Sequence, residues 1–159
     1  MANTAIYPGS FDPFTFGHLD IVKKSARLFD RVYIVLGVNT AKDRCFDCEG
    51  MKTAIEETLR MEGLTNCEVC LHDGLVAVFA AERNIGYMIR GLRNSLDYNY
   101  EENIAEVNNL INPDLEYVYF RAENVAVSSS MVRELLTFDQ DVSKYVPQPV
   151  IAMLESSKA

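Results

Sequence analysis

A glycine-rich segment, a histidine and a helical pattern lie together near the N-terminus. Gly9 permits a tight turn after the apolar run Thr4–Tyr7, and Gly17 and His18 open a segment with apolar residues at helical spacing. Backbone amides and the dipole at a helix N-terminus favour a bound anion. His18 could therefore donate a hydrogen bond to a phosphoryl oxygen. The alternative is a capping or core histidine, which the glycine-rich approach to the helix disfavours.

Three other segments place cations or hydroxyl groups directly after predicted strands. Lys42 follows the second strand, and Arg90 and Arg93 follow the fourth. Ser128–Ser130 open a helical pattern after the fifth strand. Two arginine side chains can direct two guanidinium groups at one polyanion, and serine hydroxyls and free amides can bind phosphate oxygens.

Each of these features also has an ordinary structural explanation. Lys42 alone would be a solvated lysine, and the serines could simply cap a helix. Arg90 and Arg93 could form surface ion pairs with Asp97 or Glu101. Because all of them are expected at one edge of one sheet, the combination favours a polyphosphate site.

Short apolar runs alternate with helical patterns along the whole chain, residues 1–159, and no linker divides it. The predicted strands are Thr4–Tyr7, Val32–Val38, Cys67–Leu71, Tyr87–Ile89 and Leu115–Phe120. The predicted helices are 17–29, 51–61, 75–83, 96–111, about 130–138 and 149–155. This order predicts an α/β fold: a single-domain, doubly wound, Rossmann-like five-stranded parallel sheet with helices on both faces. Such sheets bind ligands at the carboxyl ends of their strands, near the point where strand order switches.

Composition narrows the class of protein. The chain of 159 residues is 48% hydrophobic and 24% charged, which is typical of globular domains and not of disordered ones. A net charge of −8 argues against a general nucleic-acid binder. No apolar run approaches 18 residues and the N-terminus lacks a signal-peptide pattern, so we expect no membrane association and a cytoplasmic location with reduced thiols.

Two segments resemble a known superfamily. Thr15–His18 is similar to the T/H-x-G-H signature of the nucleotidyltransferases, and Val127–Arg133 resembles their second signature. The opening segment AIYPGSFDPFTFGHLDIV (5–22) and the segment IRGLRN (89–94) with Glu101 resemble the bacterial phosphopantetheine adenylyltransferases. The resemblance covers nearly the whole chain.

This resemblance implies a reaction in coenzyme A biosynthesis. ATP and 4′-phosphopantetheine would give dephospho-coenzyme A and pyrophosphate, with Mg²⁺ carried by ATP and no metal ligands from the protein. It also implies a homohexamer and feedback binding of coenzyme A. The alternatives are a nucleotidyltransferase of the same fold with another phosphate acceptor, such as nicotinate mononucleotide or glycerol phosphate, and a non-catalytic nucleotide-binding module.

The resemblance also implies residue roles. His18, Lys42 and Arg90 would be catalytic, with His18 stabilising the transition state. Ser10, Lys42 and Arg90 would hold the phosphate of 4′-phosphopantetheine, and Val76 would contact its pantetheine arm. The residues implied for ATP are Ser10, Phe11, His18, Gly91, Leu92, Arg93, Glu101, Asn124, Val125, Ala126, Val127, Ser128, Ser129 and Ser130.

The sequence departs from the family pattern in four places. Ser10 replaces the usual threonine, and Phe16 stands where a polar residue is common. Gly50 and Met51 replace the last two residues of an F-S/T-x-E-E-R pattern, and Asn124–Val127 lacks an aromatic residue often present there.

The four cysteines allow a second hypothesis. Cys45 and Cys48 form one C-x-x-C pair, and Cys67 and Cys70 form another, at a spacing typical of zinc sites. However, Cys67–Leu71 is a predicted strand, so the side chains of Cys67 and Cys70 should point to opposite faces of the sheet. Cys45 and Cys48 are also expected at the other edge of the sheet from Cys67. We therefore expect no shared zinc ion.

Overall fold

The computed structural model describes residues 2–38, 43–123 and 127–157. The strands are β1 (Thr4–Gly9), β2 (Arg31–Gly37), β3 (Cys67–His72), β4 (Tyr87–Leu92) and β5 (Glu116–Arg121). The helices are α1 (Phe16–Leu28), α2 (Cys48–Met61), α3 (Val76–Glu82), α4 (Ser95–Ile111), α5 (Ser129–Thr137) and α6 (Gln148–Ser156). The strands and helices predicted from the sequence all occur, with ends that differ by a few residues.

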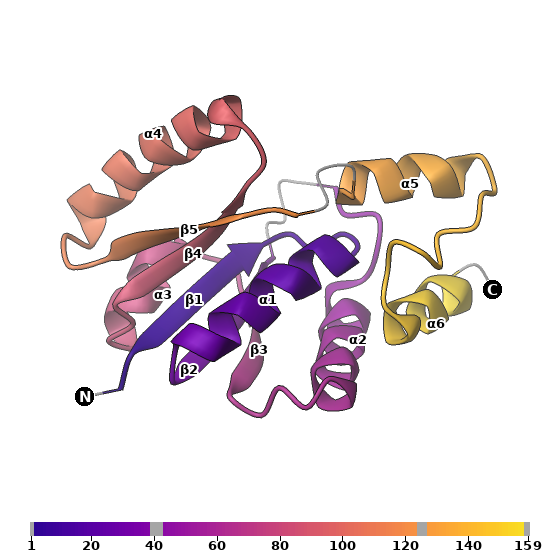
Figure 1. Cartoon of the computed structure of the whole chain (residues 1–159), viewed down its shortest axis with the longest axis horizontal. Helices are drawn as coiled ribbons and strands as arrows, with labels where there is room; N and C mark the ends of the chain where they lie inside the picture. Colours follow the sequence, from indigo (N-terminus) through magenta and orange to yellow (C-terminus); the bar gives the residue numbers. More distant parts are fainter. Residues whose placement is uncertain (1, 39–42, 124–126, 158–159) are drawn as a thin grey trace.

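All five strands are parallel, in the order β3-β2-β1-β4-β5 (Figure 1). The chain builds outward from β1 to β3 and then returns to place β4 on the other side of β1. The switch in strand order therefore lies between β1 and β4, where a ligand site is expected in such a sheet. The predicted fold class is confirmed.

Helices cover both faces of the sheet (Figure 1). Strand residues alternate between two apolar cores, as the two-residue period of a strand requires. Ile34 and Leu36 join a large core with α1, α2, α5 and α6, whereas Val35 joins a smaller core that includes Phe79 of α3. Because β1 and β2 are buried on both faces, they read as continuous apolar runs.

Polar side chains fix where the helices nearest the predicted site begin. The side chains of Thr15, Asp47, Asn94 and Ser128 each accept a hydrogen bond from a backbone N–H in the first turn of the helix that follows. These caps satisfy amides that have no partner inside the helix. Each cap also defines the end of a loop that follows β1, β2, β4 or β5.

Strand β4 is longer than predicted. The sequence analysis placed Arg90 after the strand, but Arg90 lies within β4, opposite Tyr119 of β5. The pairing with β5 continues to Leu92. A charged residue is tolerated inside this strand because each of its guanidinium nitrogens donates to a protein oxygen, as described below.

Helices long and apolar enough to cross a membrane do not occur among residues 2–38, 43–123 and 127–157.

Candidate active site

A cleft of about 530 Å³ lies at the carboxyl ends of β1 and β4. Its walls come from the loop after β1, the start of α1, the end of β4 and the start of α5. The lining residues are Tyr7–Phe11, Thr15–His18, Asp20, Ile21, Arg90, Gly91, Arg93, Asp97, Tyr100, Glu101, Ala122, Glu123 and Val127–Ser130. The cleft therefore lies where the strand order switches, as the sequence predicted.

His18 has a defined orientation at the start of α1. The backbone N–H of Thr15 donates to His18 Nδ1 at 2.9 Å, and the backbone N–H of His18 donates to Thr15 Oγ1 at 3.3 Å. This reciprocal pair is a capping box in which histidine takes the place of the usual glutamate. Since Nδ1 accepts a hydrogen bond, the proton of the neutral ring lies on Nε2. The capping role considered for His18 is therefore real, and it leaves Nε2–H as a donor.

Aromatic rings surround the imidazole. Phe14 stacks on it with ring centroids 5.5 Å apart, and Phe11 meets it edge-on at 4.9 Å. Burial, together with the positive charges of Arg90 and Arg93, lowers the pKa of His18 from 6.5 to about 4. In the free protein His18 is thus a neutral ring at pH 7.

The start of α5 lies against the start of α1. A Cβ atom on Gly17 would lie 3.4 Å from the carbonyl oxygen of Val127, so a larger residue would crowd this contact. Ser128 caps α5, Ser129 Oγ donates to the carbonyl of Pro13 at 2.8 Å, and Ser130 Oγ accepts from Arg133. Two helix N-termini, with their dipoles, therefore meet in one cleft.

Arg90 is held by a buried carboxylate. Its Nε and Nη2 donate to the two carboxylate oxygens of Glu101 at 2.9 and 2.8 Å, and Nη1 donates to the carbonyl of Pro8 at 2.8 Å. Arg93 Nε donates to Asp97 at 3.3 Å. The ion-pair alternative considered for both arginines is thus present. Glu101, implied as an ATP contact, has both oxygens directed at Arg90, although it lines the cleft.

A second, more apolar cavity of about 330 Å³ adjoins the cleft. Val76, implied for the pantetheine arm, lies in its wall together with Val35, Leu75, Met88 and Ile104. The two cavities share four lining residues, which are Pro8, Gly9, Arg90 and Glu101. Arg90 therefore stands where a ligand in one cavity would meet a ligand in the other.

Most residues singled out from the sequence come together at these two cavities. The cleft gathers Ser10, Phe11, His18, Arg90, Gly91, Arg93, Glu101 and Val127–Ser130. Leu92 is half-buried in β4 and is not among the described lining residues of either cavity. Lys42, Asn124, Val125 and Ala126 lie outside the described residues.

Sequence reasoning missed some of the cleft wall. Asp20 and Ile21 line it one turn after Gly17 on α1, and Glu123 lines it after β5. Helical spacing from Gly17 could have identified the first two, since residues three and four apart share a face. Ile21 also lies 3.3 Å from where a Cβ atom of Gly91 would be, so this glycine permits close contact between β4 and α1.

The cysteines occupy the places predicted for them. Cys67 packs against the large core and Cys70 against the small one, so their side chains lie on opposite faces of the sheet. Cys48 begins α2, after the carboxyl end of β2, whereas Cys67 begins β3. Within the part of the chain that the structure describes, no three His, Cys, Asp or Glu residues are grouped to hold a metal ion.

Comparison with known proteins agrees with this geometry. The structure is similar to that of a Vibrio parahaemolyticus protein described as a nicotinate-nucleotide adenylyltransferase, with a TM-score of 0.73 over 98% of this chain and 93% of that one. At 16% identity this likeness concerns the fold alone.

Relatives found by sequence share a much higher identity with this chain than that structure does. A phosphopantetheine adenylyltransferase of Cytophaga hutchinsonii is 42% identical over 152 residues, which are 94% of this chain and 100% of the relative. One of Streptococcus pyogenes is 41% identical over 158 residues, which are 98% and 96% of the two chains. Residues 6–135 match the family described as cytidylyltransferase-like. The chain therefore belongs to the phosphopantetheine adenylyltransferases, within the cytidylyltransferase-like family.

Proposed function

We propose that this protein transfers the adenylyl group of ATP to 4′-phosphopantetheine, giving dephospho-coenzyme A and pyrophosphate. The names of its relatives support this reaction. The observation that carries the proposal is the junction of two unlike cavities at Arg90: a cleft with two helix N-termini beside a smaller, more apolar cavity. One is suited to a polyphosphate and the other to an uncharged arm.

ATP binds in the cleft. Its phosphates lie near the starts of α1 and α5, where the helix dipoles favour negative charge. Arg93 and the serines of α5 line the same space. The protein carries a net charge of −8, so these local cations and amides must act at short range against an acidic background.

The acceptor binds across the junction. Its pantetheine arm packs against Val76 and its apolar neighbours in the second cavity. Its phosphate lies near Arg90 and the exposed Ser10 hydroxyl in the cleft. Lys42 is proposed as a third phosphate ligand on the strength of the sequence pattern alone.

The chemistry needs positioning and charge stabilisation rather than a general base. An acceptor phosphate oxygen is already anionic near pH 7 and attacks the α-phosphorus of ATP in line. The bond from the α-phosphorus to the bridging oxygen breaks, and pyrophosphate leaves with that electron pair. His18 donates its Nε2–H to a phosphoryl oxygen on which negative charge develops. Its neutral state and fixed orientation suit a donor that never has to release a proton.

Magnesium arrives with the nucleotide. The carboxylates that line the cleft are already paired: Glu101 with Arg90, Asp97 with Arg93, and both Asp20 and Glu123 with Lys24. Such a set does not offer a dedicated magnesium cage, whereas phosphate oxygens and waters satisfy the octahedral preference of Mg²⁺. The ion would neutralise charge on the phosphates during transfer.

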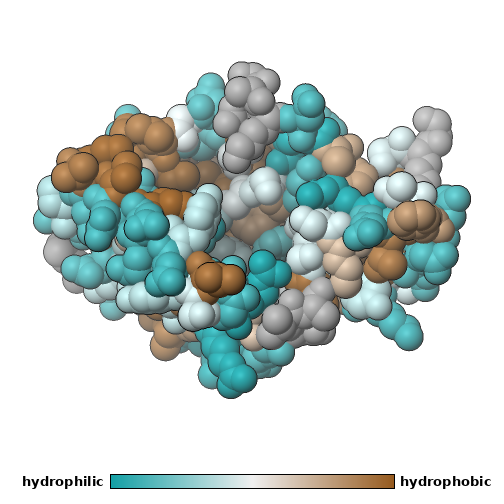
Figure 2. All heavy atoms as spheres, turned by 90° about the horizontal axis from the view of Figure 1, so that it is seen from above, coloured by the Kyte–Doolittle hydropathy of each residue, from teal (hydrophilic) through white to brown (hydrophobic). Residues whose placement is uncertain are grey.

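We further propose that the protein is a cytoplasmic homohexamer that binds coenzyme A as a feedback ligand. The assembly is supported by exposed apolar side chains on α4, among them Leu96, Val107 and Leu110, the last with 85% of its surface accessible. Apolar side chains gather at the left of Figure 2, where α4 lies in Figure 1. An apolar face of this kind favours contact between copies of the chain.

The test is pyrophosphate formation from ATP and Mg²⁺, measured with and without 4′-phosphopantetheine. We expect acceptor-dependent pyrophosphate and dephospho-coenzyme A in equal amounts. Purified His18→Ala protein, prepared in parallel, controls for a contaminating host enzyme. Nicotinate mononucleotide and glycerol phosphate are tested as rival acceptors. Turnover with a rival but not with 4′-phosphopantetheine would refute the proposed substrate, and ATP binding without turnover would favour a non-catalytic module.

A further inference from the structure

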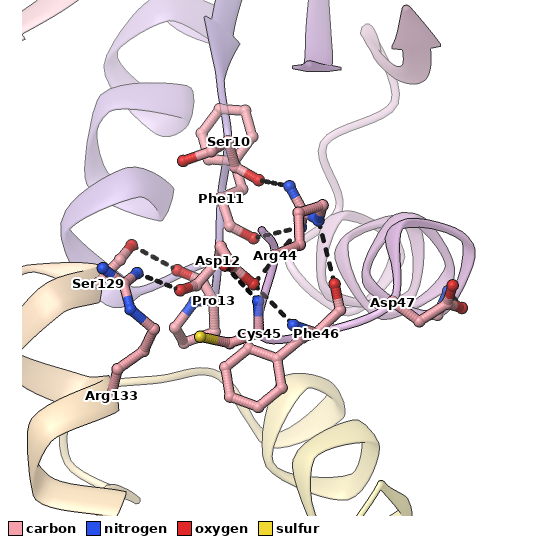
Figure 3. Close-up of polar contacts among 11 residues, drawn as sticks. Ser10, Phe11, Asp12, Pro13, Arg44, Cys45, Phe46, Asp47, Ser129 and Arg133 are labelled. Atoms are coloured by element: carbon pink, nitrogen blue, oxygen red, sulfur yellow. Dashed lines mark hydrogen bonds and ion pairs between the residues drawn. The ribbon is translucent and has the colours of Figure 1, made fainter. Parts of the chain in front are cut away.

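Arg44 joins two loops that the proposed function places at the acceptor phosphate. Its Nη1 donates to the carbonyl of Ser10 at 2.6 Å, and its Nη2 reaches the carbonyl of Phe11 at 3.5 Å (Figure 3). Its Nε donates to the carbonyl of Phe46 at 3.0 Å. One guanidinium group therefore binds carbonyls from the loop after β1 and from its own loop after β2.

Asp12, in the loop after β1, in turn binds the backbone of the loop after β2. Asp12 is buried, and its carboxylate accepts hydrogen bonds from the backbone N–H groups of Cys45 and Phe46 at 2.9 and 3.0 Å. Its Oδ1 also lies 3.7 Å from Nη2 of Arg44. The two loops are thus connected by side chains from both sides, which fixes their separation more firmly than a single contact could.

The segment held in this way has a strained backbone. Phe11 has a φ of 46°, a left-handed conformation that a bulky residue adopts only when its surroundings enforce it. Its ring is buried and meets the His18 ring edge-on at 4.9 Å. The bonds from Arg44 to the carbonyls of Ser10 and Phe11 stabilise this turn and, through it, the location of the Ser10 hydroxyl.

Arg44 does not bind substrate in this arrangement. Its side chain is 15% exposed, its guanidinium nitrogens are engaged with protein oxygens, and it is not among the described lining residues of either cavity. Arg133 approaches the same turn from α5, and its Nη1 donates to the carbonyl of Asp12 at 2.6 Å. The turn is therefore held by one arginine on the side of the β2 loop and by another on the side of α5 (Figure 3).

We propose that Arg44 is a positioning residue for the acceptor phosphate, acting through the Ser10–Phe11 turn. The proposal rests on the proposed function, because it assigns Ser10 to that phosphate. Arg44 binds the backbone of Ser10 itself, whereas α5 holds the turn on the nucleotide side. Loss of Arg44 should therefore weaken use of the acceptor more than use of ATP.

The experiment measures kcat and both KM values for Arg44→Ala, Arg44→Lys and the wild type. For Arg44→Ala we expect the KM for 4′-phosphopantetheine to rise about tenfold and the KM for ATP less than threefold, the scale of a slightly misplaced binding group. Arg44→Lys should give a smaller rise, because a point charge cannot bind three carbonyls as a planar fork does. Arg60→Ala, which removes an exposed arginine of α2 paired with Glu57, is the matched control and should behave as wild type.

Two results would overturn the proposal: an acceptor KM within twofold of wild type in folded Arg44→Ala protein, or equal rises in both KM values. Thermal unfolding and circular dichroism establish folding. Where Arg44→Ala protein does not fold, the Arg44→Lys variant is the test. A wild-type kcat and wild-type KM values in Arg44→Lys protein would then refute the positioning role of Arg44. Failure of the wild type itself on 4′-phosphopantetheine would count against the proposed substrate only, and the same comparison would then use the acceptor that reacts.

Discussion

His18 Nδ1 accepts a hydrogen bond from the backbone N–H of Thr15 at 2.9 Å, three residues before it in the chain. This contact assigns one ring nitrogen to the helix cap and leaves the other for a ligand. It also means that the orientation of the imidazole is fixed by the same turn that begins α1. The helix start and the proposed donor are therefore one structural unit.

Removal of the imidazole should slow the reaction. We expect His18→Ala to lower kcat by about 10²–10³, the usual loss for one electrostatic donor in a transition state. Steady-state pyrophosphate release measures this. Lys23→Ala, an exposed change on the same helix that removes the ion pair with Glu62, should keep the wild-type rate. An unchanged kcat in folded His18→Ala protein would exclude His18 from catalysis.

The depressed pKa of His18 predicts an unusual titration. In the ligand-free protein the ring should titrate near pH 4 rather than 6.5, with the neutral form protonated on Nε2. Nitrogen-15 NMR of the imidazole reports both properties. A midpoint near 6.5, or a proton on Nδ1, would contradict the structure.

The same pKa has a consequence for stability. The folded-state pKa is lowered, so between about pH 6.5 and 4 the unfolded chain binds a proton at His18 that the folded protein does not. The free energy of unfolding should therefore fall as the pH is lowered through this range. Urea unfolding at pH 7 and pH 5 should show a smaller loss in His18→Gln protein than in wild type. Equal losses would show that other groups dominate.

The ion pair of Arg90 and Glu101 should be strongly coupled. Arg90→Ala leaves a buried carboxylate without its partner and should cost about 2–4 kcal/mol of stability, less than a fully buried pair because the Arg90 side chain is 28% exposed. Adding Glu101→Gln should restore part of that loss. Urea unfolding of wild type, Arg90→Ala, Glu101→Gln and the double variant gives the double-mutant cycle that measures the coupling energy between the two residues. Strictly additive effects would show that the two residues do not interact.

Gly50 offers a stabilising substitution. It lies in the first turn of α2, and a Cβ atom there would lie 3.1 Å from Cε of Met153, the flexible end of a side chain that can move. Alanine also favours the helix by up to about 1 kcal/mol over glycine. We expect Gly50→Ala to raise the free energy of unfolding by about 0.5 kcal/mol, measured by urea titration. A lower stability would show that Met153 cannot adjust.

Much of the architecture could be predicted from local pattern. Val32–Val38 is a continuous apolar run because both faces of this strand pack against helices. Cys67 and Cys70 are an odd number of residues apart in a strand, which correctly predicted that their side chains lie on opposite faces of the sheet. The cluster of His18 and Ser128–Ser130 followed from one rule, that parallel strands bring their carboxyl ends to one edge. These predictions needed no knowledge of individual contacts.

Side-chain partners could not be predicted in the same way. The sequence allowed Arg90 to face a ligand or a carboxylate, and only the packing of α4 on β4 directs Glu101 at it. The bond between Arg44 and Ser10 spans 34 residues and depends on the exact path of two loops. Such contacts leave no periodic pattern in the sequence, because they form between segments that come together only in the folded structure.

The shared wall of the two cavities has a practical consequence for inhibition. Pro8, Gly9, Arg90 and Glu101 border both spaces, so ligands bound in the two cavities would lie close together. A single compound that tethers a nucleotide mimic to a pantetheine mimic would bind its second half at a high effective concentration. Tethering can raise affinity by about 10²–10⁴ over either half alone, provided the linker passes Arg90 without strain. The wall shared by the two cavities would thus be the place to join two fragments into one inhibitor.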